Sequence, residues 1–334
     1  MTATPGVATV FGGSGFVGRY ITWRLAQDGW RIRVAVRRPN EALFVKGYGD
    51  VGQVEPILAN IRDEASAEAA IKGSSLVINC VGILTETSKQ RFDQVHGEAA
   101  GRIARLSEKH GVNRFIHLSA IGANLRSDSD YARSKGEGER LVLKHMKSSV
   151  IFRPSVVFGP EDQFFNRFAG MTGISPALPL VGADTKFQPV YVDDIALAVQ
   201  KAARGDVKPD IYELGGPESM TFRDLMDMML NIIDRKRLIV SLPLFAAKTM
   251  AFGFSALEAI SLGLFHNELI TADQIKQLQR DNVVGTSAKS FSDLGITPTA
   301  MGAVLPEYLY MYRPQGQYTE MTKAAKTRTK TGQM

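Results

Sequence analysis

The sequence predicts an α/β protein in which a parallel β-sheet carries helices on both faces, followed by a smaller, mostly helical C-terminal lobe. Three observations predict it. Over the first 120 residues, short β-rich runs alternate with helical patterns, which is typical of strands joined by crossover helices. A glycine-rich loop directly follows the first run. The run Leu76 to Val81 is nearly all apolar, as expected for a strand covered on both faces.

The expected elements follow from apolar periodicity and from helix stop signals such as Gly29 and Gly111. The expected strands are Val7–Phe11, Arg31–Val36, Val51–Leu58, Leu76–Val81, Arg114–Leu118 and Val150–Arg153. The expected helices are Phe16–Asp28, Asp63–Ile71, Phe92–His110, Tyr131–Lys147 and Asp193–Ala203. We therefore divide the chain into a sheet domain (1–203), a smaller lobe (204–315) and a basic, flexible tail (316–334).

Composition excludes several classes of protein. The 334 residues are 44% hydrophobic and 22% charged, which is ordinary for a globular protein. The single cysteine, Cys80, allows neither a disulfide framework nor zinc-ligand spacing, so we expect no metal site. No secretory signal opens the chain, and Pro243, Lys248 and Glu258 interrupt its most apolar stretch, so we expect no transmembrane helix and a cytoplasmic location.

The net charge of +6 is concentrated toward the C-terminus. Four cations lie in the last twelve residues: Lys323, Lys326, Arg328 and Lys330. An anionic membrane surface or an acidic partner would attract this tail, and a solvated tail without a partner is equally consistent with it. No basic stretch is interleaved with aromatic residues, so we expect no nucleic-acid partner.

The glycine loop lies between the first strand and the first helix. It consists of Gly12, Gly13, Ser14, Gly15, Phe16, Val17 and Gly18. In such loops the first glycine permits a tight turn, the second lets the backbone approach a pyrophosphate, and the third lets the helix pack on the strand. The helix N-terminus offers unpaired N–H groups to the phosphates. This placement predicts a Rossmann-type, doubly wound sheet that binds a dinucleotide.

The end of the second strand indicates which dinucleotide. Sites selective for NAD carry an acid there, about twenty residues after the loop, whereas this chain has Arg37 and Arg38. Guanidinium groups can pair with a 2′-phosphate, so NADP(H) is favoured over NAD(H). The alternative is that both arginines are merely solvated.

Three further side chains form a constellation that suits proton transfer. Ser119 ends the fifth strand, and Tyr131 and Lys135 lie at i and i+4 of the next helix, which places them on one face. A nearby ammonium is expected to lower the pKa of the tyrosine, which favours proton transfer to a carbonyl oxygen. Lys135 can also bind the nicotinamide ribose.

The glycine loop, Leu118-Ser119, Tyr131-Ala-Arg-Ser-Lys135 and Arg153-Pro154 together resemble the extended or atypical short-chain dehydrogenases/reductases. The resemblance implies catalytic roles for Ser119, Tyr131 and Lys135. It also implies cofactor contacts in three segments: Asn60 and Ile61; Cys80, Val81 and Gly82; and Pro154, Ser155 and Val156. Extended members usually carry an asparagine in the fourth helix where this chain has Val95-His96, so a proton relay through His96 is in doubt and a structural role is the alternative.

Longer segments are more similar to one branch, the nucleotide-binding accessory subunits of respiratory complex I. They are Val10–Tyr20, Phe115–Ser119, Ala123-Asn124, Pro154–Phe168 and Lys186–Asp194. This resemblance implies tightly held NADPH with a structural, assembly or regulatory role, contact with other complex I subunits, and a peripheral position at the cytoplasmic face of a bacterial inner membrane. The apolar stretch from 238 to 269 is expected to touch lipid or a partner subunit, or to pack on the chain's own core.

Two classes of function follow from these residues. The first is the accessory subunit, non-catalytic, with bound NADP(H). The second is a free-standing NADP-dependent reductase or epimerase that uses Ser119, Tyr131 and Lys135.

Overall fold

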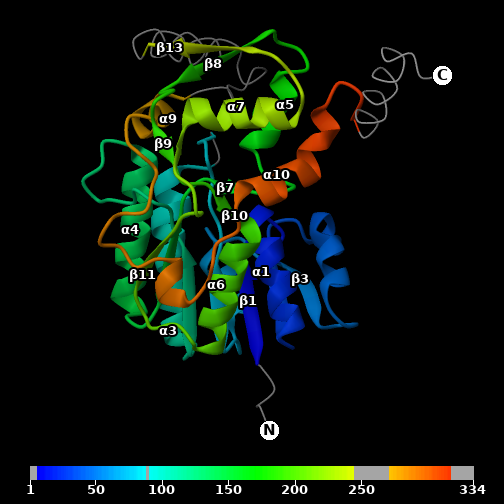
Figure 1. The fold of residues 1–334 in the computed structure, drawn as a ribbon. Coiled ribbons are helices and arrows are strands. Elements are labelled where there is room, and N and C mark those ends of the chain that lie inside the picture. Colours follow the sequence, from blue (N-terminus) through cyan, green and yellow to red (C-terminus); the bar gives the residue numbers. More distant parts are fainter. Residues whose placement is uncertain (1–5, 88–89, 244–270, 317–334) are drawn as a thin grey trace, which may run out of the picture.

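Seven parallel strands form the central sheet of the protein, in the order β11-β6-β5-β4-β1-β2-β3. The structure is a computed structural model that describes residues 6–87, 90–243 and 271–316 (Figure 1). The strands of the sheet are β1 (Val7–Phe11), β2 (Arg31–Val36), β3 (Val54–Leu58), β4 (Leu76–Asn79), β5 (Arg114–Leu118), β6 (Val150–Pro154) and β11 (Ile211–Leu214). The predicted α/β class with a parallel sheet is confirmed.

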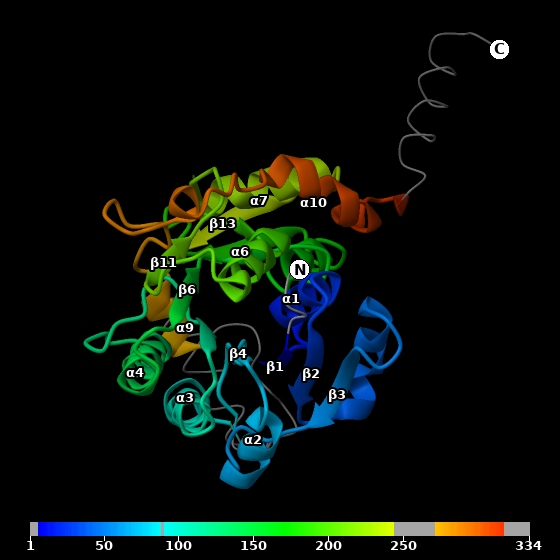
Figure 2. The same cartoon turned by 90° about the horizontal axis from the view of Figure 1, so that it is seen from below.

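Helices cover both faces of the sheet, as Figure 2 shows. One face packs against α1 (Phe16–Gln27), α6 (Val192–Arg204) and the 3₁₀ helix η1 (Pro39–Tyr48). The other packs against α2 (Glu64–Ile71), α3 (Ala99–Lys109) and α4 (Asp130–His145). Each face therefore buries its own apolar cluster, and the strands between the two clusters carry apolar side chains toward both faces.

A smaller lobe lies over the carboxyl edge of the sheet, at the top of Figure 1. Its helices are α5 (Phe165–Met171), α7 (Phe222–Ile232), α9 (Ala272–Gln277) and α10 (Met301–Leu309), with the 3₁₀ turn η4 (Tyr310–Tyr312). Another 3₁₀ turn, η3 (Phe291–Leu294), packs instead on the face of the sheet that α6 covers. Its strands pair two by two: β8 (Ala177–Val181) with β13 (Leu238–Leu242), β7 (Val157–Phe158) with β10 (Val190–Tyr191), and β9 (Lys186–Phe187) with β12 (Met220–Thr221). A third apolar cluster, rich in phenylalanine, joins these elements apart from α9, whose Ile275 packs in a small separate cluster with Val181.

The register of the sheet brings the loops after β1, β2 and β4 to one place. Phe11, the last residue of β1, pairs with Ala35 on one side and with Asn79 on the other. Because parallel strands end at the same edge, the glycine loop and the segments after residues 36 and 79 open side by side there. This is the edge at which the sequence places the dinucleotide.

The structure differs from the sequence-based boundaries mainly in four places. The strand expected from Val51 begins at Val54. The strand expected to run to Val81 ends at Asn79, where the chain leaves the sheet. The helix expected from Phe92 begins with a π-helical turn, η2 (Asp93–Glu98), before α3. The seventh strand, β11, comes from beyond residue 203, so the smaller lobe contributes an edge strand to the sheet. The division of the chain at 203 stays a prediction.

Parts of the chain that carried expectations lie outside the described residues. They include most of the apolar stretch at 238–269, namely 244–269, and the basic tail from 317 onward. Among the helices of the described ranges, none combines the length and the hydropathy needed to cross a bilayer.

Candidate functional site

A cleft of about 650 Å³ opens at the carboxyl edge of the sheet beside β1, β2, β3 and β4. Ten of the predicted cofactor residues line it: Gly12, Ser14, Gly15, Arg37, Arg38, Asn60, Ile61, Cys80, Val81 and Gly82. The structure thus brings together four segments that are distant in sequence. Burial raises the pKa of Cys80 to about 12, so the thiol stays protonated and serves as a small wall residue.

The glycine loop has the geometry of a phosphate cradle. Gly12 has a φ of +75°, a region that favours glycine, and its N–H donates to the Ala35 carbonyl at 3.1 Å. A Cβ at Gly18 would lie 2.1 Å from the Gly12 oxygen, so only glycine lets α1 start this close to the loop. The first amide to bond four residues back is that of Arg19, to Gly15. The preceding amides of the first turn therefore remain available to an anion.

Cations surround the outer rim of the cleft. Arg37 and Arg38 are both exposed, and Arg38 pairs with Glu41 at 2.9 Å. Arg37 has no ion pair within the part of the chain that the structure describes. Arg62 also lines the cleft and, with Glu41, was missed by sequence reasoning. Its position two residues after Asn60, at a strand's carboxyl end, is the signal that could have identified it.

Lys135 lies beside this cleft, in contact with Tyr131 and with the end of β5, the strand that Ser119 follows. Lys135 is buried in α4, and its Nζ donates to the Leu118 carbonyl at 3.4 Å and lies 5.9 Å from the Tyr131 ring centroid. A Cβ at Gly82 would lie 3.4 Å from the same Nζ, so the lysine reaches the wall of the nucleotide cleft. Ser119 is 5% exposed, and its Oγ has no hydrogen-bond partner among the described atoms. A buried hydroxyl without a partner, at the carboxyl end of β5, leaves a hydrogen-bonding group for a ligand at this edge of the sheet.

The expected lowering of the Tyr131 pKa is wrong. Burial raises the pKa of Tyr131 to about 12, because removing the phenolate from water outweighs an ammonium that lies beside the ring. Burial also lowers the pKa of Lys135 to about 8. At neutral pH the tyrosine is therefore protonated and can donate a hydrogen bond. The lysine is also mostly protonated, because its pKa lies only slightly above neutral pH.

His96 has a structural role in this arrangement. Its Nε2 accepts the Ile83 N–H at 3.0 Å, so the proton resides on Nδ1, which faces the Ser134 hydroxyl at 3.0 Å. Its ring also packs against Tyr131, with centroids 5.3 Å apart. Desolvation lowers the pKa of His96 to about 2, so this imidazole remains neutral. It holds the segment after Gly82 in place, which favours the structural role over a proton relay.

The predicted nicotinamide-side segment is held by the smaller lobe. Its members Pro154, Ser155 and Val156 lie at the end of β6 and beyond it, and they do not line the 650 Å³ cleft. Ser155 is buried, and its hydroxyl lies 2.6 Å from the Asn282 Oδ1 and 2.9 Å from the Asn282 carbonyl. Gly13, Phe16, Val17 and Gly18 also stand outside the cleft lining, beneath the loop or within α1.

Comparisons with known proteins identify the family of the chain. The family model for the NAD dependent epimerase/dehydratase family matches residues 8–215. An Arabidopsis thaliana protein named NADH dehydrogenase [ubiquinone] 1 alpha subcomplex subunit 9, mitochondrial, is 34% identical over 93% of this chain and 79% of its own length. Its Mus musculus namesake is 32% identical over 96% and 85%. A Caulobacter vibrioides ceramide reductase is 28% identical over 72% and 75%.

Among solved structures, the fold is similar to DesIV, a dTDP-glucose 4,6-dehydratase from Streptomyces venezuelae with NAD and TYD bound. The TM-score is 0.68 at 16% identity, over 92% of this chain and 96% of that one. At this identity the likeness concerns the fold alone. The chain belongs to the NAD dependent epimerase/dehydratase family and, within it, to the family of subunit 9 of the NADH dehydrogenase 1 alpha subcomplex.

Proposed function

We propose that the chain is an NADP(H)-binding accessory subunit of respiratory complex I, in which the bound nucleotide stabilises or regulates the subunit. One observation carries this proposal: similarity to named complex I subunits extends over 93–96% of the chain, and the nucleotide cleft lies within the matched region. The subunit would act by holding nucleotide in the cleft at the carboxyl edge of its sheet, away from the electron path.

The choice of NADP(H) rests on charge at the end of β2. Arg37 and Arg38 line the cleft at this position, where a site selective for NAD places an acid. Glu41 pairs with Arg38 from the next element, which leaves Arg37 as the guanidinium best placed to meet a 2′-phosphate. The cations at this rim therefore outnumber the acid.

Two measurements test the proposal. Purification of the respiratory complex from native membranes in mild detergent should retain this chain, and its absence from an intact, active complex would refute the subunit role. Nucleotide released by heat should be NADP(H), identified by chromatography. A purified subunit that releases no pyridine dinucleotide and binds none would refute the cofactor assignment.

Charge-removal variants separate the two cofactors. Arg37→Ala should weaken binding of NADPH by about ten- to a hundredfold, because a hydrogen bond to a charged group contributes roughly 1.5–3 kcal/mol, and it should leave NADH binding unchanged. Arg31→Ala is the matched control, since Arg31 is an exposed arginine at the opposite end of the same strand. Equal losses for NADH and NADPH would contradict selectivity through the 2′-phosphate.

We also propose a peripheral position at the cytoplasmic face of a bacterial inner membrane. Exposed apolar side chains in the smaller lobe support it. Leu238 and Val240 are exposed on β13, and Ile174, which is 95% exposed, precedes β8, the strand that pairs with β13. Washing native membranes with high salt should leave the chain attached to the complex, while detergent should release both together. Quantitative recovery of the chain in the soluble fraction without detergent would contradict this placement.

The second candidate is a free-standing NADP-dependent reductase or epimerase. The retained Ser119, Tyr131 and Lys135 and the similarity to a ceramide reductase favour it. That similarity spans 72% of the chain, less than the match to the complex I subunits. Turnover of a carbonyl substrate that is abolished by Tyr131→Phe would establish this alternative, and unchanged turnover would exclude Tyr131 as its acid.

A further inference from the structure

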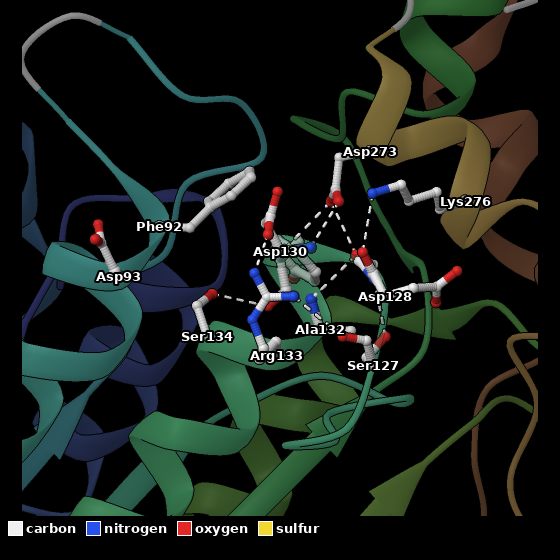
Figure 3. Close-up of polar contacts among 12 residues, drawn as sticks. Phe92, Asp93, Ser127, Asp128, Asp130, Ala132, Arg133, Ser134, Asp273 and Lys276 are labelled. Carbon is white, nitrogen blue, oxygen red and sulfur yellow. Dashed lines mark hydrogen bonds and ion pairs between the residues drawn. The ribbon is translucent and has the colours of Figure 1, made fainter.

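A carboxylate from the smaller lobe caps the helix that carries Tyr131 and Lys135. This is Asp273, on the short helix α9, which lies against the N-terminus of α4 (Figure 3). The contact joins residues about 144 positions apart in sequence. It is therefore a tertiary feature, independent of the local sequence of α4.

The capping geometry satisfies the orphan amides of α4. The Asp130 N–H donates to Asp273 Oδ1 at 2.7 Å, and the Tyr131 N–H donates to Asp273 Oδ2 at 3.2 Å. The Ser129 hydroxyl donates to Asp273 Oδ2 at 2.9 Å and accepts the Ala132 N–H at 3.2 Å. One carboxylate thus completes the N-cap begun by Ser129, and its negative charge complements the helix dipole.

Two cations hold α9 in register with this N-terminus. The Lys276 Nζ donates to the Asp128 carbonyl at 2.9 Å, as Figure 3 shows, and Arg280 pairs with the Asp128 carboxylate at 3.0 Å. Gln277 also donates to Asp273 Oδ2 at 3.1 Å, which fixes the carboxylate from its own helix. Both anchors contact the loop before α4 and not the nucleotide cleft, so they can be varied without touching the site.

The position of this first turn determines where two site residues lie. Tyr131 belongs to the capped turn, and its ring packs against Phe92 and His96 at 5.6 and 5.3 Å between centroids. Lys135 follows one turn later on the same face and reaches Gly82 in the cleft. Fraying of the first turn would release the Tyr131 backbone and loosen the turn that follows.

We propose that Asp273 is a positioning residue of the nucleotide site, through which the smaller lobe sets the affinity for the nicotinamide half of the dinucleotide. The inference rests on the proposed function, since it takes NADP(H) as the ligand. Asp273 acts through α4 and does not line the cleft. Losing the cap lowers the fraction of molecules with an ordered α4 terminus, and the apparent affinity falls by that fraction.

Two probes separate this role from general damage. NADPH uses both halves of the site, whereas 2′,5′-ADP carries only the adenosine half, which the glycine loop and the arginine rim would bind. Asp273→Ala in the full chain should weaken NADPH about three- to tenfold and leave 2′,5′-ADP within twofold of the wild type. The NADPH affinity of Asp273→Asn should lie between those of the wild type and Asp273→Ala, because an amide keeps one acceptor oxygen and loses the other.

Asp224→Ala is the matched control. Asp224 lies in the first turn of α7 and bonds to Thr221 there, so the variant removes the same charge from another helix N-terminus of the smaller lobe. It should change neither affinity. Amide hydrogen exchange in the nucleotide-free protein gives a second readout: Asp273→Ala should speed exchange at Asp130 and Tyr131.

The outcomes distinguish the inference from the function on which it rests. Wild-type protein that binds neither probe would overturn the proposed function, and the inference with it. Wild-type protein that binds both, with an Asp273→Ala variant that matches it or loses both probes equally, would overturn only the positioning role. Unchanged exchange at Tyr131 would also overturn it, because the cap would then contribute nothing to the helix terminus.

Discussion

Replacing Gly18 by alanine tests the phosphate cradle most directly. The added Cβ would lie 2.1 Å from the Gly12 oxygen, 2.8 Å from the Gly13 Cα and 2.9 Å from the Gly12 carbonyl carbon. All three atoms belong to the backbone, so no side chain can rotate away. A normal carbon–oxygen contact is over 3 Å. The loop or the start of α1 must therefore move by about 1 Å, and overpacking of this kind costs about 1–3 kcal/mol.

The larger effect is expected on nucleotide binding. A shift of about 1 Å takes amide–phosphate hydrogen bonds out of their normal range of 2.7–3.2 Å. Losing two hydrogen bonds to charged phosphate oxygens, each roughly 1.5–3 kcal/mol, corresponds to at least a hundredfold weaker binding. Titration of NADPH with the purified variant measures the affinity, and thermal unfolding without nucleotide measures the stability.

Gly47→Ala is the control for this experiment. A Cβ at Gly47 meets nothing within 4 Å, and the residue lies in η1 outside the left-handed region. Its affinity for NADPH should equal that of the wild type, and its stability should be unchanged or higher by up to about 1 kcal/mol. A Gly18→Ala variant that binds NADPH within threefold of the wild type would refute the close approach of α1 to the loop.

Three more predictions concern buried polar groups. Burial lowers the pKa of His96 to about 2 and that of His117 to about 3, so between pH 7.5 and 5.5 the unfolded chain takes up protons that the folded chain does not. The free energy of unfolding should therefore fall by about 1.4 kcal/mol per histidine over this range. His117→Leu should halve this loss, measured by denaturant titration at the two pH values, and an unchanged loss would contradict a neutral His117. Lys135→Met removes a buried ammonium whose pKa is lowered to about 8. The free energy of unfolding of the nucleotide-free protein should therefore rise by up to about 3 kcal/mol at pH 7, while NADPH binding weakens. A lower free energy of unfolding would contradict the cost of burying that charge. Tyr308→Phe removes the hydroxyl that donates to buried Asp162 and should cost about 1–3 kcal/mol of unfolding free energy, and no measurable change would show that this contact is dispensable.

Local sequence was sufficient for much of the fold. Apolar runs of strand length and helix stop signals at Gly29 and Gly111 are local features, so strands β1, β2 and β5 were predicted with the observed bounds. The glycine loop was identified because its chemistry is contained within seven consecutive residues. Arg37 and Arg38 were placed at the cleft because strand length alone fixes where a parallel strand ends.

The sequence by itself determined the glycine loop and the face shared by Tyr131 and Lys135, because each depends on neighbours within a short segment. It also determined the parallel sheet, because strands that alternate with crossover helices pair in parallel. Only the tertiary structure decided the raised pKa of Tyr131, since desolvation depends on what other segments cover the phenol. It also decided the Asp273 cap, which joins two distant elements. Interactions of that kind arise from packing, and no local pattern of residues encodes them.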